Sequence, residues 1–181
     1  MKFASKLKYI ALLIILVSLF ACAEKEEFPI TPYIEFKSFY KYQNESGLDN
    51  KGKLTIFFTD GDGDIGLGQG DTLAPFNPGS KYYYNFFIQY LEKINGKFEE
   101  IYITIYNTET QEFDTITHHA RIPPLTTNLV NKGIKGDIEI ALDIYNYINP
   151  VNDTIAFDVY IVDKALHKSN VVRTPEIIVK K

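Results

Sequence analysis

The apolar residues beyond position 30 recur at every second position, and this period constrains the fold more than any other feature of the chain. Residues 53–58, 137–144 and 155–162 follow it most clearly. A period of two places successive side chains on opposite faces of a β-strand, whereas a helix needs a period of about 3.6. No stretch beyond residue 30 keeps a helical period for three turns. The chain is therefore predicted to be all-β.

The pattern predicts about seven strands separated by turn signals. The first strand is expected to begin with Ile34 and Phe36, and the others are expected at residues 53–58, 82–93, 98–106, 137–144, 155–162 and 171–179. Asn95-Gly96 favours the positive φ angles of a type I′ hairpin turn between the third and fourth of them. Pro175 marks the last strand as an edge or a bulge. This arrangement predicts an immunoglobulin-like antiparallel β-sandwich over residues 33–181.

The beginning of the chain has the features of a secretory signal peptide. Lys2, Lys6 and Lys8 precede a largely apolar run at residues 10–20. The run is too short for a permanent membrane helix, which needs about 20 apolar residues. Residues 1–21 are therefore expected to be removed on export, and the alternative is a buried core helix.

Cys22 is the only cysteine, so the chain can form neither an intramolecular disulfide nor a CxxC redox motif. Together with Leu19-Phe20-Ala21 it resembles the bacterial lipobox, where a signal peptidase cuts before the cysteine. The resemblance implies that Cys22 carries acyl chains such as palmitate and becomes the mature N-terminus. Several acyl chains anchor a protein stably in a membrane. Residues 22–32 would form the lipidated tether of the β-sandwich.

The segment after Cys22 is charged. Ala23-Glu24-Lys25-Glu26-Glu27 resembles the signal that exports Bacteroidota lipoproteins to the outer face of the outer membrane, which implies a cell-surface location. The alternative is an ordinary solvated tether. Removal of residues 1–21 takes away three lysines and no acid, and changes the net charge from −4 to −7. This balance offers no basic footprint for nucleic acid.

The chemically most specific motif is the acidic loop Asp60-Gly61-Asp62-Gly63-Asp64, which directly follows a predicted strand. Its carboxylates repel one another, and a hard cation such as calcium would remove that cost. The spacing matches positions 1, 3 and 5 of an EF-hand loop, with Asp71 at position 12. Ile65 stands where an EF-hand has glycine, and strands replace the flanking helices. We therefore expect a calcium loop on a β-domain, with a solvated turn as the alternative.

Asp163 is a further candidate ligand from another part of the chain. In an immunoglobulin-like sandwich the B–C and F–G loops lie at the same end. If residues 53–58 form strand B and residues 155–162 form strand F, Asp60 and Asp163 both follow their strands at that end. Asp163 is then predicted to complete the calcium shell, and the alternative is that it caps a turn.

Three segments together resemble uncharacterised Bacteroidota lipoproteins with an immunoglobulin-like domain. The segments are Phe58 to Leu67 with the DGDGDIG motif, Lys135-Gly136-Asp137-Ile138, and Val162 to Pro175. The resemblance covers most of the chain after Cys22. It implies the location and the fold, and it implies no activity.

Three Asp-Thr-apolar triplets resemble the acceptor of Bacteroidota O-glycosylation. Thr72, Thr115 and Thr154 would carry the glycan, and Thr115 is expected to be the most loop-like of them. The alternative is chance, because Asp-Thr is common at the start of a strand.

The sequence offers little for catalysis. Its serines lie in no nucleophile-elbow motif, and the adjacent His118 and His119 would point to opposite faces of a strand, which is poor geometry for one metal ion. We therefore expect a non-enzymatic, lipid-anchored binding or assembly module whose partner is an envelope protein or a glycan. The alternatives are an accessory hydrolase or glycan-processing enzyme of the outer membrane and a periplasm-facing structural lipoprotein.

Overall fold

The computed structural model describes residues 27–125, 132–144 and 153–180, and these residues contain ten β-strands and no helix. The strands are β1 (Tyr33–Gln43), β2 (Asp49–Asp60), β3 (Phe86–Ile94), β4 (Lys97–Glu100), β5 (Ile103–Asn107), β6 (Glu112–Ile116), β7 (Ile134–Asp143), β8 (Thr154–Ile161), β9 (Val172–Arg173) and β10 (Ile177–Ile178). Among the described residues, accordingly, no helix has the length and apolar character needed to cross a membrane.

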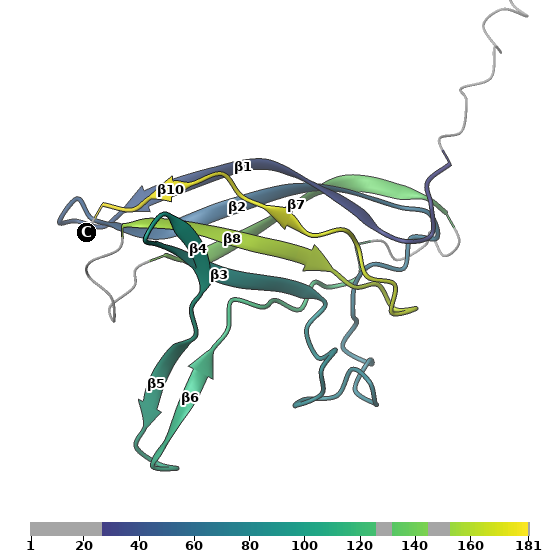
Figure 1. The fold of residues 1–181 in the computed structure, drawn as a ribbon. Coiled ribbons are helices and arrows are strands. Elements are labelled where there is room, and N and C mark those ends of the chain that lie inside the picture. Colours follow the sequence, from purple (N-terminus) through teal and green to yellow (C-terminus); the bar gives the residue numbers. More distant parts are fainter. Residues whose placement is uncertain (1–26, 126–131, 145–152, 181) are drawn as a thin grey trace, which may run out of the picture.

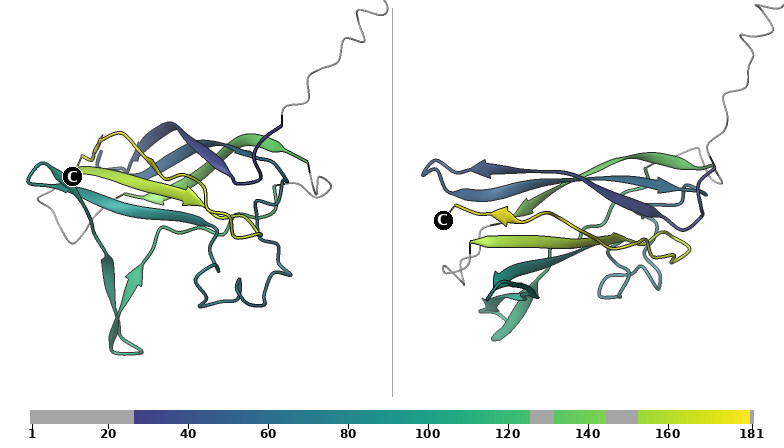
Figure 2. Two further views of the ribbon diagram at one scale, coloured as in Figure 1. Left: turned by 45° about the vertical axis from the view of Figure 1, so that its right-hand side comes forward. Right: turned by 45° about the horizontal axis from the view of Figure 1, so that its top comes forward.

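Two antiparallel sheets pack face to face (Figures 1 and 2). The first has the order β1-β2-β7, and the second has the order β10-β8-β3-β4, with β9 also paired to β8. In immunoglobulin nomenclature these orders read A-B-E and G-F-C-C′. The predicted all-β sandwich is confirmed.

The core lies between the sheets and follows the alternation seen in the sequence. Leu54, Ile56 and Phe58 of β2 are buried, as are Phe157 and Val159 of β8. Because successive side chains of a strand face opposite sides, every second residue of these strands enters the core. The apolar period therefore fixed which face of each sheet is inside.

Two local predictions about the backbone are confirmed. Asn95 and Gly96 connect β3 to β4 with φ angles of 51° and 81°, as a type I′ turn requires. The predicted last strand is divided into β9 and β10, and Pro175 lies between them. Proline lacks the N–H that a continuous strand would donate.

Two predicted strands differ from the structure in ways that change the topology or the loops. β3 begins at Phe86 rather than residue 82, because Tyr83 closes a turn by donating its N–H to the Ser80 carbonyl at 3.1 Å. The strand predicted at 98–106 is broken after Glu100. Its second part, β5, leaves the sandwich and pairs with β6, a strand that the sequence did not predict. Figure 1 shows this β5–β6 hairpin projecting from the body of the protein.

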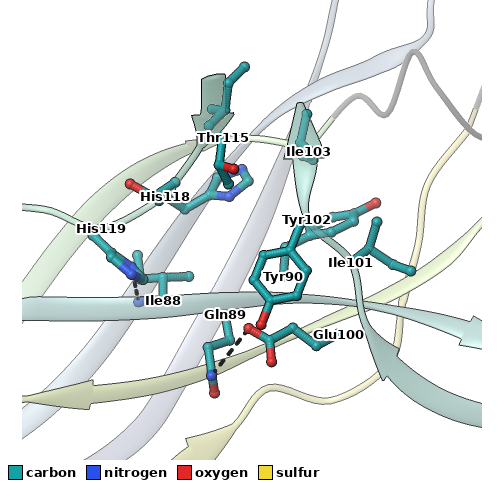
Figure 3. A pocket seen from close by; sticks show the side chains of 12 residues that line it. Ile88, Gln89, Tyr90, Glu100, Ile101, Tyr102, Ile103, Thr115, His118 and His119 are labelled. Carbon is teal, nitrogen blue, oxygen red and sulfur yellow. Dashed lines mark hydrogen bonds between the residues drawn. The ribbon is translucent and has the colours of Figure 1, made fainter. Parts of the chain in front are cut away.

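A small pocket of about 90 Å³ lies between β3 and the base of the β5–β6 hairpin (Figure 3). Both histidines line it with separate neighbours: His118 Nε2 lies 2.9 Å from the carbonyl oxygen of Asp143, and His119 Nδ1 accepts the Ile88 N–H at 3.1 Å. Burial lowers the pKa of His119. Glu100, the acid of this pocket, accepts a hydrogen bond from Gln89.

Candidate metal centre

The acidic loop is held by the fold on both sides of its carboxylates. Asp60 is the last residue of β2 and is fully buried. A Cβ at Gly61 would lie 2.2 Å from the carbonyl oxygen of Phe28, so the crossing of the N-terminal segment requires glycine there. Ile65 and Leu67 are buried, and Leu67 donates its N–H to the Ile122 carbonyl at 2.8 Å. The loop is therefore anchored in the core and is not a solvated turn.

A second loop brings Asp163 to the same place. Asp163 follows β8 and is 1% exposed. The two loops are joined directly, because Asp64 Oδ2 accepts the N–H of Ala165 at 3.1 Å. The predicted meeting of these loops at one end of the sandwich is confirmed.

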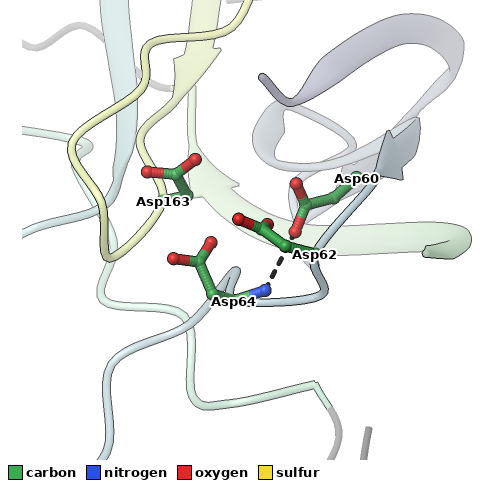
Figure 4. Close-up of side chains that lie close together, drawn as sticks. All are labelled: Asp60, Asp62, Asp64 and Asp163. Carbon is green, nitrogen blue, oxygen red and sulfur yellow. Dashed lines mark hydrogen bonds between the residues drawn. The ribbon is translucent and has the colours of Figure 1, made fainter. Parts of the chain in front are cut away.

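Four carboxylates converge where the loops meet. Asp60, Asp62, Asp64 and Asp163 each offer one oxygen, and these oxygens all lie within 4.8 Å of one another. Figure 4 shows the three loop carboxylates facing that of Asp163 across a common space. The cluster could hold a metal ion.

Three oxygens of the cluster lack a protein partner. The Oδ1 atoms of Asp60, Asp62 and Asp64 are buried and accept no hydrogen bond from the described residues. The opposite oxygen of Asp60 accepts the Asp64 N–H at 3.0 Å. Buried polar atoms without a partner are rare, and each one needs an explanation such as an ion. Their convergence distinguishes the cluster from an ordinary group of surface acids.

The cluster is electrostatically strained without a cation. Burial, followed by the negative charges of Asp62, Asp64 and Asp163, raises the pKa of Asp60 to about 7. Burial and then the charges of Asp163 and Asp62 raise the pKa of Asp64 to about 6. Burial also raises the pKa of Asp163, against the hydrogen bonds that it accepts from His167. A bound cation would favour the ionised forms of all these groups.

His167 positions Asp163, and sequence reasoning did not identify it. Its backbone N–H donates to Asp163 Oδ1 at 2.7 Å, and its Nδ1 lies 2.9 Å from Asp163 Oδ2. This hydrogen bond and the charge of Asp163 raise the pKa of His167. The only feature of the sequence that indicated this contact was that His167 follows Asp163 by four residues.

The prediction that Asp71 belongs to the cluster is wrong. Asp71 Oδ2 accepts the Gly68 N–H at 2.7 Å and forms an ion pair with Lys164 at 2.9 Å. Asp71 is absent from the group of converging carboxylates, whereas position 12 of an EF-hand returns to the ion. Asp71 instead ties the long β2–β3 loop to the loop after β8.

Arg121 organises the remainder of the β2–β3 loop. Its guanidinium donates to four backbone carbonyls, those of Gly68, Asp71, Phe76 and Tyr83, at 2.7 to 3.3 Å. A planar group with five donors suits this role. No motif in the sequence indicated it, because the four acceptors are backbone atoms.

The other predicted sites lie apart from the cluster. Thr72 is exposed in the β2–β3 loop, and Thr154 begins β8 and donates to Asp153. Thr115 is exposed but lies in β6, so the expectation that it is the most loop-like is wrong. The signal peptide and Cys22 lie outside the described residues.

Comparisons with protein-family models, with curated proteins and with solved structures found no match for the chain.

Proposed function

We propose that this protein is a calcium-binding β-sandwich, anchored by lipid on Cys22 at the cell surface, that acts as a binding or assembly module and not as an enzyme. The observation that carries the calcium site is the group of three buried Oδ1 atoms of Asp60, Asp62 and Asp64, which have no partner among the described residues. Calcium takes six to eight oxygen ligands, and waters would complete the shell.

The set of ligands favours calcium over magnesium. Calcium lies 2.3–2.6 Å from its ligands, so two opposite ligands are about 4.6–5.2 Å apart. The four oxygens lie within 4.8 Å of one another. Four carboxylates from two loops suit calcium, which accepts many oxygen ligands in a flexible geometry. Magnesium demands a near-ideal octahedron, usually keeps several waters and binds through one or two carboxylates.

Enclosure of the site supports a binding role. Asp60 is 0% exposed and Asp163 is 1% exposed, so an ion between them joins two loops and leaves little room for a substrate. Such an ion would order the end of the sandwich, where loops form recognition surfaces in related architectures. Calcium binding would then stabilise a surface for an envelope protein or a glycan.

Equilibrium dialysis with radioactive calcium tests the site directly. We expect one calcium ion per chain with a dissociation constant of about 10⁻⁴–10⁻³ M, as in extracellular modules. Asp71→Asn is the matched control and should bind normally, because Asp71 pairs with Lys164 outside the cluster. The absence of saturable binding in the wild type, or its loss in Asp71→Asn, would contradict the proposal.

The lipid anchor has its own test. Cys22→Ser is expected to leave uncleaved precursor or a soluble form, because the acceptor of the acyl chains is gone. Mass spectrometry of the N-terminal peptide and protease treatment of intact cells give the readout. An unlipidated wild-type N-terminus would reject the anchor, and protection of the wild type from protease would reject the surface location.

A further inference from the structure

The β5–β6 hairpin is separate from both main sheets. Among the described residues its two strands pair only with each other, and the left view of Figure 2 shows it projecting from the sandwich. A two-stranded hairpin by itself is only marginally stable in water. No other strand of the described residues pairs with its outer edges, so the backbone N–H and C=O groups there are open to the addition of another strand.

The hairpin exposes large apolar side chains. Tyr102, Tyr106 and Phe113 are 67%, 49% and 69% exposed, and Ile105 and Ile116 are 56% and 41% exposed. Tyr106 pairs directly with Phe113 across the strands, and their rings meet edge to face at 5.2 Å. Exposed apolar side chains that lie against each other, as Tyr106 and Phe113 do, mark interaction sites.

The register places different side chains on the two faces of β6. Side chains alternate along a strand, so Phe113 and Thr115 share one face with Tyr106, while Glu112, Asp114 and Ile116 share the other with Ile105. Residues 98–120 contain five acidic residues and no lysine or arginine. Repulsion of like charges disfavours a second copy of this hairpin or an anionic lipid surface as its partner.

We propose that the outer edge of β6 binds an extended segment of a partner protein in which cationic and apolar side chains alternate. Strand addition would satisfy the free backbone groups of β6. Cationic residues opposite Glu112 and Asp114 would pair with them, and apolar residues opposite Phe113 would extend the aromatic face. The inference names a partner for the proposed binding module and does not depend on calcium.

Binding of two synthetic peptides to the purified full chain tests this inference. One peptide alternates four lysines with four valines, and the other has four lysines followed by four valines. The two peptides have the same charge and composition. Because side chains alternate along a strand, only the alternating peptide can place all its lysines on one face of the strand. Measured by fluorescence anisotropy, the alternating peptide is expected to bind about tenfold more tightly. Equal binding of the two peptides, or none, overturns the proposal.

Matched variants locate the contact. Glu112→Lys and Phe113→Ser are expected to weaken binding of the alternating peptide by about tenfold. Glu45→Lys makes the same change in net charge elsewhere, and Leu73→Ser removes another exposed apolar side chain, so both should bind within about twofold of the wild type. Unchanged binding by the hairpin variants overturns the proposal, as does equal weakening by the controls. Each measurement is repeated with calcium and with chelator, so failure of the calcium site is distinguishable.

Three other occupants are outcomes of the same study. We test binding to neutral lipid vesicles, binding to a neutral polysaccharide, and self-association in analytical ultracentrifugation. If no peptide binds and one of these activities is lost in Phe113→Ser, the hairpin is assigned to that occupant. Any of these results would overturn the proposed basic strand.

Discussion

Asp60→Asn is expected to raise the melting temperature of the calcium-free protein at pH 7.5 by about 5 °C. The expected gain in the free energy of unfolding is about 2 kcal/mol, and each kcal/mol raises the melting temperature of a domain of this size by about 2–4 °C. Asp60 is fully buried among three other carboxylates, and its pKa is raised to about 7. A shift of one pKa unit corresponds to about 1.4 kcal/mol, so ionised Asp60 costs the fold up to about 4 kcal/mol. Asparagine removes that charge and keeps an acceptor for the Asp64 N–H.

Asp49→Asn is the matched control for this variant. Asp49 is buried like Asp60, with 1% of its surface exposed. Its Oδ2, however, accepts hydrogen bonds from Lys41 Nζ at 2.6 Å and from the Lys180 N–H at 2.8 Å. Its ionised form is therefore stabilised, and loss of the charge should destabilise the protein. If Asp60→Asn lowers the melting temperature in chelator as Asp49→Asn does, the cluster is not strained in the way that we describe.

The calcium-free protein is expected to become more stable when the pH falls from 7.5 to 5. The pKa of Asp60 is 3.8 in the unfolded chain and about 7 in the fold, and that of Asp64 rises to about 6. The fold therefore binds more protons than the unfolded chain in this window, and its stability falls as the pH rises. The pKa of His167 is also raised, so its contribution to stability is present below pH 6.5 and is likewise lost as the pH rises.

The expected gain from Asp60 is about 2 kcal/mol, seen in urea titrations at the two pH values with chelator present. His119 opposes it below pH 6.5, because burial lowers its pKa. Asp60→Asn isolates the effect, since the gain in stability at low pH should shrink in this variant while the opposing contribution of His119 stays. An identical pH dependence in both proteins would show that Asp60 does not titrate between these states.

The sequence predicted the core and the meeting of the two acidic loops for the same reason. The period of two puts Leu54 and Phe58 on one face of their strand, and that face is buried. The assignment of residues 53–58 and 155–162 to strands B and F then placed Asp60 and Asp163 at one end. Both inferences depend only on alternation and topology, which local sequence patterns encode.

The features that the sequence did not predict depend on the path of the chain. The alternation of Ile101, Ile103 and Ile105 is typical of a core strand. Alternation alone, however, does not show that the chain leaves the sheet after Glu100 and forms β5. Asp71 pairs with Lys164 and the Gly68 N–H instead of joining the cluster, and the spacing of helical calcium loops does not apply to a loop between strands.

The response of the melting temperature to calcium tests the central claim most directly. With 1 mM calcium and a dissociation constant near 0.1 mM, linkage predicts about 1.4 kcal/mol of added stability, and the wild type should melt about 3–6 °C higher than in chelator. Magnesium should do less, Asp49→Asn should keep the response, and Asp60→Asn should lose it. If the wild type melts at the same temperature with calcium and with chelator, or if Asp60→Asn responds like the wild type, the four carboxylates are not a calcium site.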